Sequence, residues 1–149
     1  MNAKVFFDTN VLIYLYSIDE PEKQHKALQR IETTENRWIS AQVLSELCNT
    51  LHRKFKLEYS AIAKVLTEIQ ASFQVITVQP DTIKQALDLA RIYRYSYYDS
   101  LIIAAALEQS CNILYSEDMQ NEQIIERHTL ILNPFTATEL GNERIGQQQ

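Results

Sequence analysis

Glycine is almost absent from this sequence. The 149 residues include two glycines, Gly141 and Gly146, and both lie close to the C-terminus. Walker loops and Rossmann fingerprints need glycine between a strand and a helix, because there the backbone must come very close to a phosphate. Since no glycine occurs before residue 141, the sequence excludes both of these kinds of nucleotide-cofactor site.

Cysteines and long apolar runs are also scarce. Cys48 and Cys111 stand among apolar residues far apart in the chain, and we interpret them as buried free thiols. The apolar stretch from Val11 to Tyr16 is too short for a transmembrane helix or a signal peptide, and charged residues follow it closely. We therefore expect a cytoplasmic protein that makes no membrane contact.

An excess of positive charge is missing as well. The chain has 14 lysines and arginines against 19 aspartates and glutamates, so its net charge is −5 and its pI is about 5.2. A protein that coats nucleic acid needs a broad basic face, and the net charge therefore argues against this class. It does not argue against a nuclease that binds divalent cations, because two such ions would add four positive charges and change −5 to −1.

Local basic clusters nevertheless occur at two places. The first consists of Arg53, Lys54 and Lys56, and the second of Arg91 and Arg94, which precede three tyrosines. Basic side chains interleaved with aromatic rings can bind a single RNA strand through charge and stacking. A solvated helix face beside tyrosines that pack in the core would show the same pattern. The five basic residues are predicted RNA contacts, and this structural alternative stays open.

Strand-like and helix-like segments alternate over most of the chain. The expected strands are residues 4–8, 37–40, 74–78, 112–116 and 129–132, and the expected helices are residues 9–15, 22–35, 41–55, 59–72, 80–93, 98–109 and a short one at 121–125. This alternation predicts a three-layer α/β/α fold, with a central parallel sheet of about five strands and helices on both faces. Residues 1–134 are expected to form a single domain, and residues 135–149 a polar, partly frayed tail.

Four acidic residues follow strands, either directly or on the next helix. They are Asp8, Glu46, Asp99 and Asp118, and 110 residues separate the first from the last. A parallel sheet gathers the carboxyl ends of its strands along one edge, so residues this distant in sequence can meet in one cleft. Four carboxylates in one cleft would repel each other unless a hard cation were bound between them. The pattern therefore suggests a Mg²⁺ or Mn²⁺ site.

Each of these acids also has a simpler structural interpretation. Asp8 and Asp99 stand at helix starts, where an aspartate commonly caps the first free amides. Glu46 lies on the polar side of its helix, opposite an apolar stripe, as a solvated glutamate would. Asp118 and its neighbour Glu117 can both be solvated loop acids, and they compete for the fourth place in the site.

Four short motifs around these acids give the sequence a family resemblance. They are Asp8-Thr9-Asn10-Val11-Leu12, Ser40-Ala41-Gln42-Val43-Leu44-Ser45-Glu46-Leu47, Tyr98-Asp99-Ser100-Leu101-Ile102 and Ser116-Glu117-Asp118. In this order, and in a glycine-poor chain of this length, the motifs resemble those of the PIN-domain ribonucleases. Within that family they are similar to the VapC-type toxins of bacterial toxin–antitoxin pairs. The resemblance covers residues 3 to 133.

The resemblance implies a PIN fold, an activity and a set of site residues. The activity would be that of an endoribonuclease that depends on Mg²⁺ or Mn²⁺, uses one or two ions, and hydrolyses RNA with a metal-activated water. The implied catalytic metal ligands are Asp8, Glu46, Asp99 and Asp118, with Glu117 as the alternative to Asp118. The implied residues that orient these ligands are Thr9, Asn10 and Ser116.

The resemblance also implies partners. We expect an RNA substrate, a small cognate antitoxin and a second copy of the chain in a homodimer. The apolar side chains of Leu12, Ile13, Leu15 and Tyr16 are a candidate docking or dimer face, although core packing explains most of them equally well. Two alternatives stay open: a PIN-fold RNA-processing nuclease without an antitoxin, and an inactive PIN-fold module that binds RNA or protein.

Overall fold

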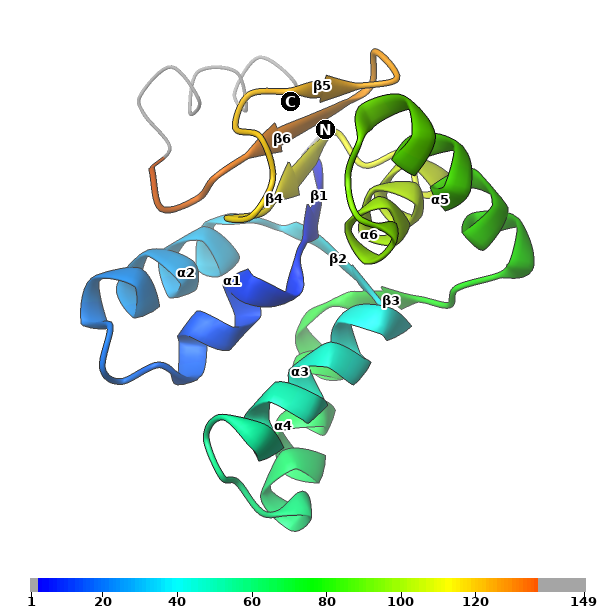
Figure 1. Ribbon diagram of the computed structural model, residues 1–149. Helices are drawn as coiled ribbons and strands as arrows, with labels where there is room; N and C mark the ends of the chain where they lie inside the picture. Colours follow the sequence, from blue (N-terminus) through cyan, green and yellow to red (C-terminus); the bar gives the residue numbers. More distant parts are fainter. Residues whose placement is uncertain (1–2, 137–149) are drawn as a thin grey trace.

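The computed structural model of this chain describes residues 3–136, so most of the expected tail lies outside the described residues. Figure 1 shows a central sheet with helices packed against it. The strands are β1 (Lys4–Phe7), β2 (Asn36–Ser40), β3 (Gln74–Ile76), β4 (Ile113–Tyr115), β5 (Ile124–Ile125) and β6 (Thr129–Leu132). The helices are α1 (Thr9–Ile13), the 3-10 turn η1 (Tyr14–Tyr16), α2 (Pro21–Thr33), α3 (Ala41–Arg53), α4 (Tyr59–Ser72), α5 (Pro80–Tyr93) and α6 (Tyr97–Glu108).

The six strands form one sheet in the order β3-β2-β1-β4-β6-β5. Five of them are parallel, because β1 pairs with β2 and β4, β2 pairs with β3, and β4 pairs with β6 in the same direction. The short strand β5 runs antiparallel to β6 at the edge. The predicted α/β fold with a central parallel sheet is confirmed, and β5 is an addition to the five strands expected.

The helix expected at residues 121–125 is wrong, because these residues form a turn and then β5. The backbone N–H of Glu122 donates to the carbonyl of Ile131 at 2.7 Å, and the N–H of Ile131 donates to the carbonyl of Gln123 at 2.8 Å. Ile125 is fully buried beside β6. Pairing with a neighbouring strand therefore overrides the local sequence pattern, as is common for β-structure.

Helix starts and ends follow from a few residues. Ser40 caps α3, and its Oγ accepts a hydrogen bond from the N–H of Val43 at 3.4 Å. Both α2 and α5 begin with proline at a position where its fixed φ suits the helix. α5 ends at Arg94, which takes the left-handed conformation (φ 67°) usually given to glycine, at a cost of about 1 kcal/mol.

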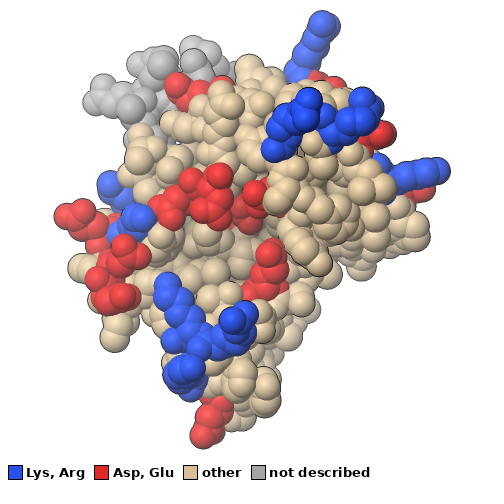
Figure 2. Space-filling view, in the orientation of Figure 1, with Lys and Arg blue, Asp and Glu red and all other residues tan. Residues whose placement is uncertain are grey.

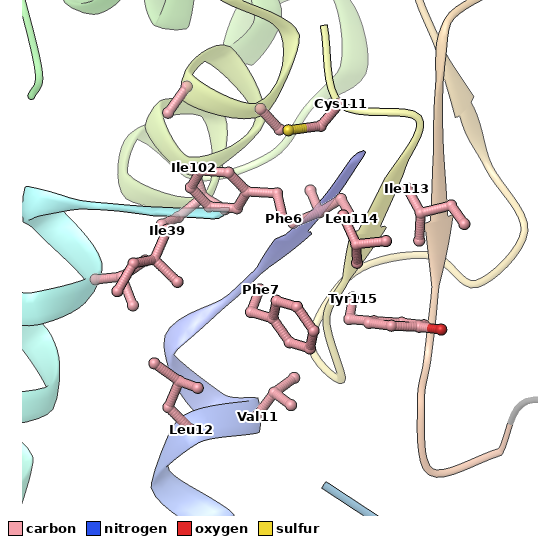
Figure 3. Packing of buried hydrophobic residues seen from close by; sticks show 14 of the residues in the cluster. Phe6, Phe7, Val11, Leu12, Ile39, Ile102, Cys111, Ile113, Leu114 and Tyr115 are labelled. Atoms are coloured by element: carbon pink, nitrogen blue, oxygen red, sulfur yellow. The ribbon is translucent and has the colours of Figure 1, made fainter. Parts of the chain in front are cut away.

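The core is centred on β1, whose residues Phe6 and Phe7 are fully buried on opposite faces of the sheet. Figure 3 shows both side chains beside β4, where Phe6 pairs with Leu114 and Phe7 with Tyr115. The ring of Phe7 also meets the ring of Tyr115 at a centroid distance of 5.4 Å. Apolar packing on both faces fixes the position of β1, and with it the position of the residue that follows.

The topology brings the ends of β1 and β4 together. From β1 the chain moves outward to β2 and β3, and α5 and α6 then return it to β4 on the other side of β1 (Figure 1). Open parallel sheets bind ligands in the crevice outside the carboxyl ends of the strands, at the point where the strand order reverses. Here that point lies between Asp8, which follows β1, and Ser116, which follows β4.

Burial changes the interpretation of several apolar residues. Leu12 is fully buried, so it belongs to the core and not to a docking face, whereas Leu15 and Tyr16 are half-buried against the core. Cys111 is a buried free thiol as expected, while Cys48 is free but only half-buried. Within residues 3–136, no helix is long and apolar enough to cross a membrane.

Candidate metal centre

Asp8 lies at the carboxyl end of β1, beside the end of β4. Its backbone N–H donates to the carbonyl of Tyr115 at 2.9 Å, which extends the pairing of the two strands by one residue. The side chain is 5% exposed. Its Oδ1 accepts from the N–H of Thr9 at 2.7 Å, and its Oδ2 accepts from the hydroxyl of Ser116 at 2.8 Å. Asp8 therefore caps α1 with one oxygen and contacts the end of β4 with the other.

The electrostatic surroundings of Asp8 disfavour its charge. Burial raises the pKa of Asp8 from 3.8 to about 7, the hydrogen bonds from Ser116 and Thr9 oppose this rise, and the charges of Asp99 and Glu46 add to it. Among the described residues, the groups that donate hydrogen bonds to this carboxylate are neutral. An ionised Asp8 therefore lies in a buried site that is short of positive charge.

Glu46 lies on α3 and contacts Thr9, the residue that follows Asp8. Its Oε1 accepts a hydrogen bond from the hydroxyl of Thr9 at 2.9 Å, so Thr9 links Asp8 to Glu46 with its N–H and its hydroxyl. Burial raises the pKa of Glu46, and the charge of Asp99 raises it further, while the Thr9 hydroxyl lowers it. Glu46 is half-buried, so the solvated glutamate suggested by helix periodicity is not what the structure shows.

Asp99 lies in the first turn of α6. The cap of this helix is Ser96, whose Oγ accepts from the N–H of Asp99 at 3.2 Å, so the interpretation of Asp99 as the cap is wrong. Burial raises the pKa of Asp99, the hydrogen bond with Ser96 lowers it, and the charge of Asp118 raises it. Asp99 therefore interacts electrostatically with Asp8, Glu46 and Asp118.

Asp118 joins the site through Asn10. The Nδ2 of Asn10 donates to Oδ2 of Asp118 at 3.0 Å and to Oδ2 of Asp8 at 3.3 Å, so one amide bridges two carboxylates. The hydroxyl of Ser116 accepts from the N–H of Asp118 at 3.2 Å. Asn10 and Ser116 therefore hold an exposed acid and a buried acid in one arrangement. We call Asp8, Glu46, Asp99 and Asp118 the acidic junction.

Glu117 belongs to a different network. The hydroxyl of Tyr14 donates to its Oε1 at 2.6 Å, and Nζ of Lys23 lies 2.6 Å from its Oε2. Lys23 also donates to the Tyr14 hydroxyl at 3.1 Å, and these hydrogen bonds raise the pKa of Lys23. We call Tyr14, Lys23 and Glu117 the Glu117 clasp. The carboxylate of Asp118, and not that of Glu117, shares the amide group of Asn10 with Asp8.

Sequence reasoning missed the clasp residues Tyr14 and Lys23. The backbone N–H of Glu117 also donates to Oδ1 of Asn10 at 3.2 Å, so the clasp is connected to the residue that bridges Asp8 and Asp118. Tyr14 and Lys23 lie 103 and 94 residues from Glu117. No motif or spacing in the sequence relates them to it, and only the folded chain shows the link.

The donor set of the acidic junction suits a hard cation. Within residues 3–136 no three Asp, Glu, His or Cys side chains are close enough together to form a ready-made metal cage. The junction offers only carboxylate oxygens, and Mg²⁺ is commonly bound by one or two carboxylates together with waters and substrate phosphates. Carboxylates that act on one another's charge and are supported by neutral hydrogen-bond donors fit such an ion.

The predicted RNA contacts fall into two groups on the surface. Figure 2 shows acidic side chains across the middle of one face, with Lys and Arg gathered over the end of α3 and over the end of α5. Asn49, Thr50, Arg53 and Lys54 line an open pocket of about 260 Å³ on α3. Arg91 on α5 lies 3.8 Å from Asp88. The remaining residues of the two clusters, Lys56 and Arg94, are exposed and both have positive φ.

Comparison with protein families gives one match, and comparison with curated protein sequences gives none. A model of the PIN domain matches residues 5–126. No curated sequence matches the chain. The match spans β1 to β5 and includes all four residues of the acidic junction.

Several solved structures share this fold. A toxin–antitoxin complex from Klebsiella pneumoniae superposes with a TM-score of 0.68 at 20% identity, covering 88% of this chain and 98% of that chain. VapC20 of Mycobacterium tuberculosis, a toxin that cleaves the sarcin-ricin loop, gives 0.64 at 21% identity, covering 77% and 90%. The DNA-bound VapBC of Salmonella typhimurium gives 0.61 at 16% identity, covering 87% and 96%. At these identities the likeness shows a shared fold.

Proposed function

The chain belongs to the PIN-domain family, and from this premise we propose that it is a Mg²⁺- or Mn²⁺-dependent endoribonuclease that hydrolyses RNA phosphodiester bonds. The observation that carries the proposal is the acidic junction at the point where the strand order reverses. Its carboxylates come from four separate parts of the chain, and their hydrogen-bond donors are uncharged. Such a site needs a cation to be stable in its ionised form.

The residues of the junction have distinct tasks in this proposal. Asp8, Glu46, Asp99 and Asp118 would hold one or two ions, and Thr9, Asn10 and Ser116 fix their oxygens by hydrogen bonds. A cation bound by carboxylates lowers the pKa of a bound water and stabilises charge on the phosphodiester and its leaving oxygen. The chain therefore needs no histidine as general base. Arg53, Lys54, Lys56, Arg91 and Arg94 are the proposed contacts to RNA phosphates.

We extend the proposal to a toxin that acts in the cytoplasm and is held by a cognate antitoxin. The similar structures include a toxin–antitoxin complex and a VapBC complex. In this chain an open groove of about 370 Å³ runs along η1 and α2, and its walls include Leu15, Tyr16, Pro21 and Leu28. Nearby Ile18 is 85% exposed. An apolar groove beside an exposed isoleucine suits an apolar protein segment, and we also keep the homodimer as part of this proposal.

A cleavage assay tests the nuclease. Fluorescently labelled single-stranded RNA is incubated with the purified protein in Mg²⁺ or in Mn²⁺, and with EDTA or the Asp8→Asn variant as controls. We expect cleavage by the wild type alone, and only with a divalent ion present. Equally poor cleavage by wild type and variant in both ions would contradict the nuclease, and RNA binding under those conditions would identify a non-catalytic binding module.

The toxin assignment has its own test. Expression of the wild-type chain in a bacterial host should arrest growth, and expression of the Asp8→Asn variant should not. A nuclease that cleaves RNA in vitro while leaving growth unaffected would instead indicate an RNA-processing enzyme without an antitoxin.

A further inference from the structure

The open pocket on α3 contains basic side chains without acidic partners. Within residues 3–136, neither Arg53 nor Lys54 forms a salt bridge. Lys23 and Arg91 differ in this respect, because Lys23 is paired with Glu117 and Arg91 with Asp88. Two exposed cations without counterions, beside two neutral polar side chains, suit an anionic ligand.

The pocket continues the surface that carries Glu46. Residues three or four apart share one face of a helix, so Glu46, Thr50 and Arg53 lie in one row along α3. At a rise of 1.5 Å per residue, Arg53 is about 10 Å further along α3 than Glu46. The pocket is therefore outside the acidic junction but adjacent to it.

The pocket on α3 is basic and the junction is acidic. This difference suits an RNA strand that is cleaved at the junction and held at the pocket. The carboxylates repel phosphate except where a cation intervenes, whereas Arg53 and Lys54 attract it directly. Asn49 and Thr50 add neutral hydrogen-bond donors in the same pocket. In Figure 2 the basic group over the end of α3 faces the same side of the molecule as the acidic residues. A single strand can contact both without passing around the protein.

We propose that the pocket lined by Asn49, Thr50, Arg53 and Lys54 binds a phosphate of single-stranded RNA beside the one that is cleaved. This inference rests on the proposed nuclease activity and states on which side of the junction the uncut part of the substrate is held. Arg53 can bind two phosphate oxygens at once, and Lys54 contributes a mobile point charge. Because phosphate contacts carry no base information, the pocket raises affinity equally for all RNA sequences.

The test removes the two positive charges and compares RNA binding with a matched control. Arg53→Gln/Lys54→Gln is the test variant, and Lys84→Gln/Arg127→Gln loses the same charge at exposed positions on α5 and in the β5–β6 turn. A labelled mixed-sequence RNA of about 20 nucleotides is titrated by fluorescence anisotropy in EDTA, which prevents metal-dependent cleavage. The titration is repeated over a range of KCl concentrations.

We expect the test variant to bind RNA about tenfold more weakly, since two exposed contacts of about 0.7 kcal/mol each give this factor. The slope of log K against log salt should fall by about 1.4, or about 0.7 per lost contact to a single strand. In Mg²⁺ the KM should rise by a similar factor, with kcat within about twofold of wild type, because the pocket holds substrate equally before and during cleavage. The control should keep the wild-type slope.

Other outcomes would overturn the inference. An equal change of slope in both double variants would mean that only overall charge matters. An unchanged slope in the test variant, with loss of binding to a partner protein, would make the pocket a protein contact. Arg53→Lys keeps the charge and should keep the slope, which separates lost charge from misfolding. If the wild type neither binds nor cleaves RNA, the proposed function itself fails, so the two failures are distinguishable.

Discussion

The acidic junction and the Glu117 clasp are adjacent in the fold, but only in the clasp does a cationic side chain among the described residues balance the negative charge. In the junction, Asp8 receives hydrogen bonds from Ser116, Thr9 and Asn10, and none of these donors is charged. In the clasp, the ammonium of Lys23 lies 2.6 Å from the Glu117 carboxylate. Of the two neighbouring acids, Asp118 belongs to the junction and Glu117 to the clasp. Proximity to the site is therefore not sufficient to make an acid available to a cation.

The pKa values of Asp8, Glu46 and Asp99 are all raised, and no cationic side chain pairs with these acids in the described structure. Burial raises the pKa of Asp8, Glu46 and Asp99, and neighbouring carboxylates raise it further. A lysine placed among them would oppose these shifts, because a nearby positive charge favours the ionised carboxylate. The fold instead supplies hydrogen bonds that orient the oxygens and leave the charge to be balanced from outside the chain.

Replacing Asp8 should give the largest effect. Asp8→Asn keeps the size of the side chain but removes the charge that lies deepest in the junction. Because a metal contributes several kcal/mol to stabilising the charge of the transition state, we expect RNA cleavage to fall by roughly a thousandfold or more. The measurement is single-turnover cleavage in Mg²⁺, with circular dichroism to confirm the fold. Cleavage within tenfold of wild type would remove Asp8 from the proposed site.

The metal-free protein should become less stable as the pH rises from about 4 to about 7. The folded state raises the pKa of Asp8 from 3.8 to about 7 and so binds more protons than the unfolded state. The resulting stability is complete below pH 3.8 and is lost as pH rises through 7, by on the order of 4 kcal/mol for a shift of about three pH units. Urea unfolding in EDTA measures this trend.

Mg²⁺ and the Asp8→Asn variant provide the controls for this pH dependence. Mg²⁺ should restore stability at pH 8 and have little effect at pH 4, because protons and metal compete for the same oxygens. Asp8→Asn should remove most of the pH dependence, with a small remainder of the same sign from Glu46 and Asp99, whose pKa values are also raised. Stability that rises with pH in EDTA would contradict the charge deficit of the junction.

The position of Asp8 in the site can be predicted from sequence, because it depends only on where a strand ends. Asp8 follows an apolar strand, and the edge where parallel strands end is set by the alternation of strands and helices. The fold and the family follow from such local patterns and are confirmed. Glu46 is different, because helix periodicity places it among solvated residues. Its contact with Thr9, which lies 37 residues away, appears only in the folded chain.

The choice between Glu117 and Asp118 could not be made from sequence for a related reason. Both are acids in one loop, and their side chains are directed by partners more than 90 residues away: Lys23 for Glu117 and Asn10 for Asp118. The strand β5 was missed because its backbone pairs with residues of β6 that follow a turn with positive φ at two non-glycine positions, Glu126 and Arg127. Pairing of this kind leaves no glycine signal in the sequence.

Replacing the two neighbouring acids in turn tests the comparison directly. Asp118→Asn should lower cleavage by about 10- to 100-fold and raise the Mg²⁺ concentration that gives half-maximal rate, since it removes a charge of the junction. Glu117→Gln removes the same charge one residue away, where Lys23 already balances it, and should change both quantities by less than about threefold. Rates are measured over a Mg²⁺ titration. A larger effect of Glu117→Gln would reverse the assignment of the fourth ligand.

The smallest effect should come from the hydroxyl of the clasp. Tyr14→Phe removes the donor to Glu117 but keeps the ring, which packs on Phe135 at a centroid distance of 4.8 Å. We expect a loss of about 1 kcal/mol in the free energy of unfolding, the usual contribution of one hydrogen bond, with Tyr16→Phe as the matched control. The Mg²⁺ dependence of cleavage should not change, because Lys23 still balances Glu117. A shift as large as that of Asp118→Asn would mean that the clasp and the junction act as one metal site.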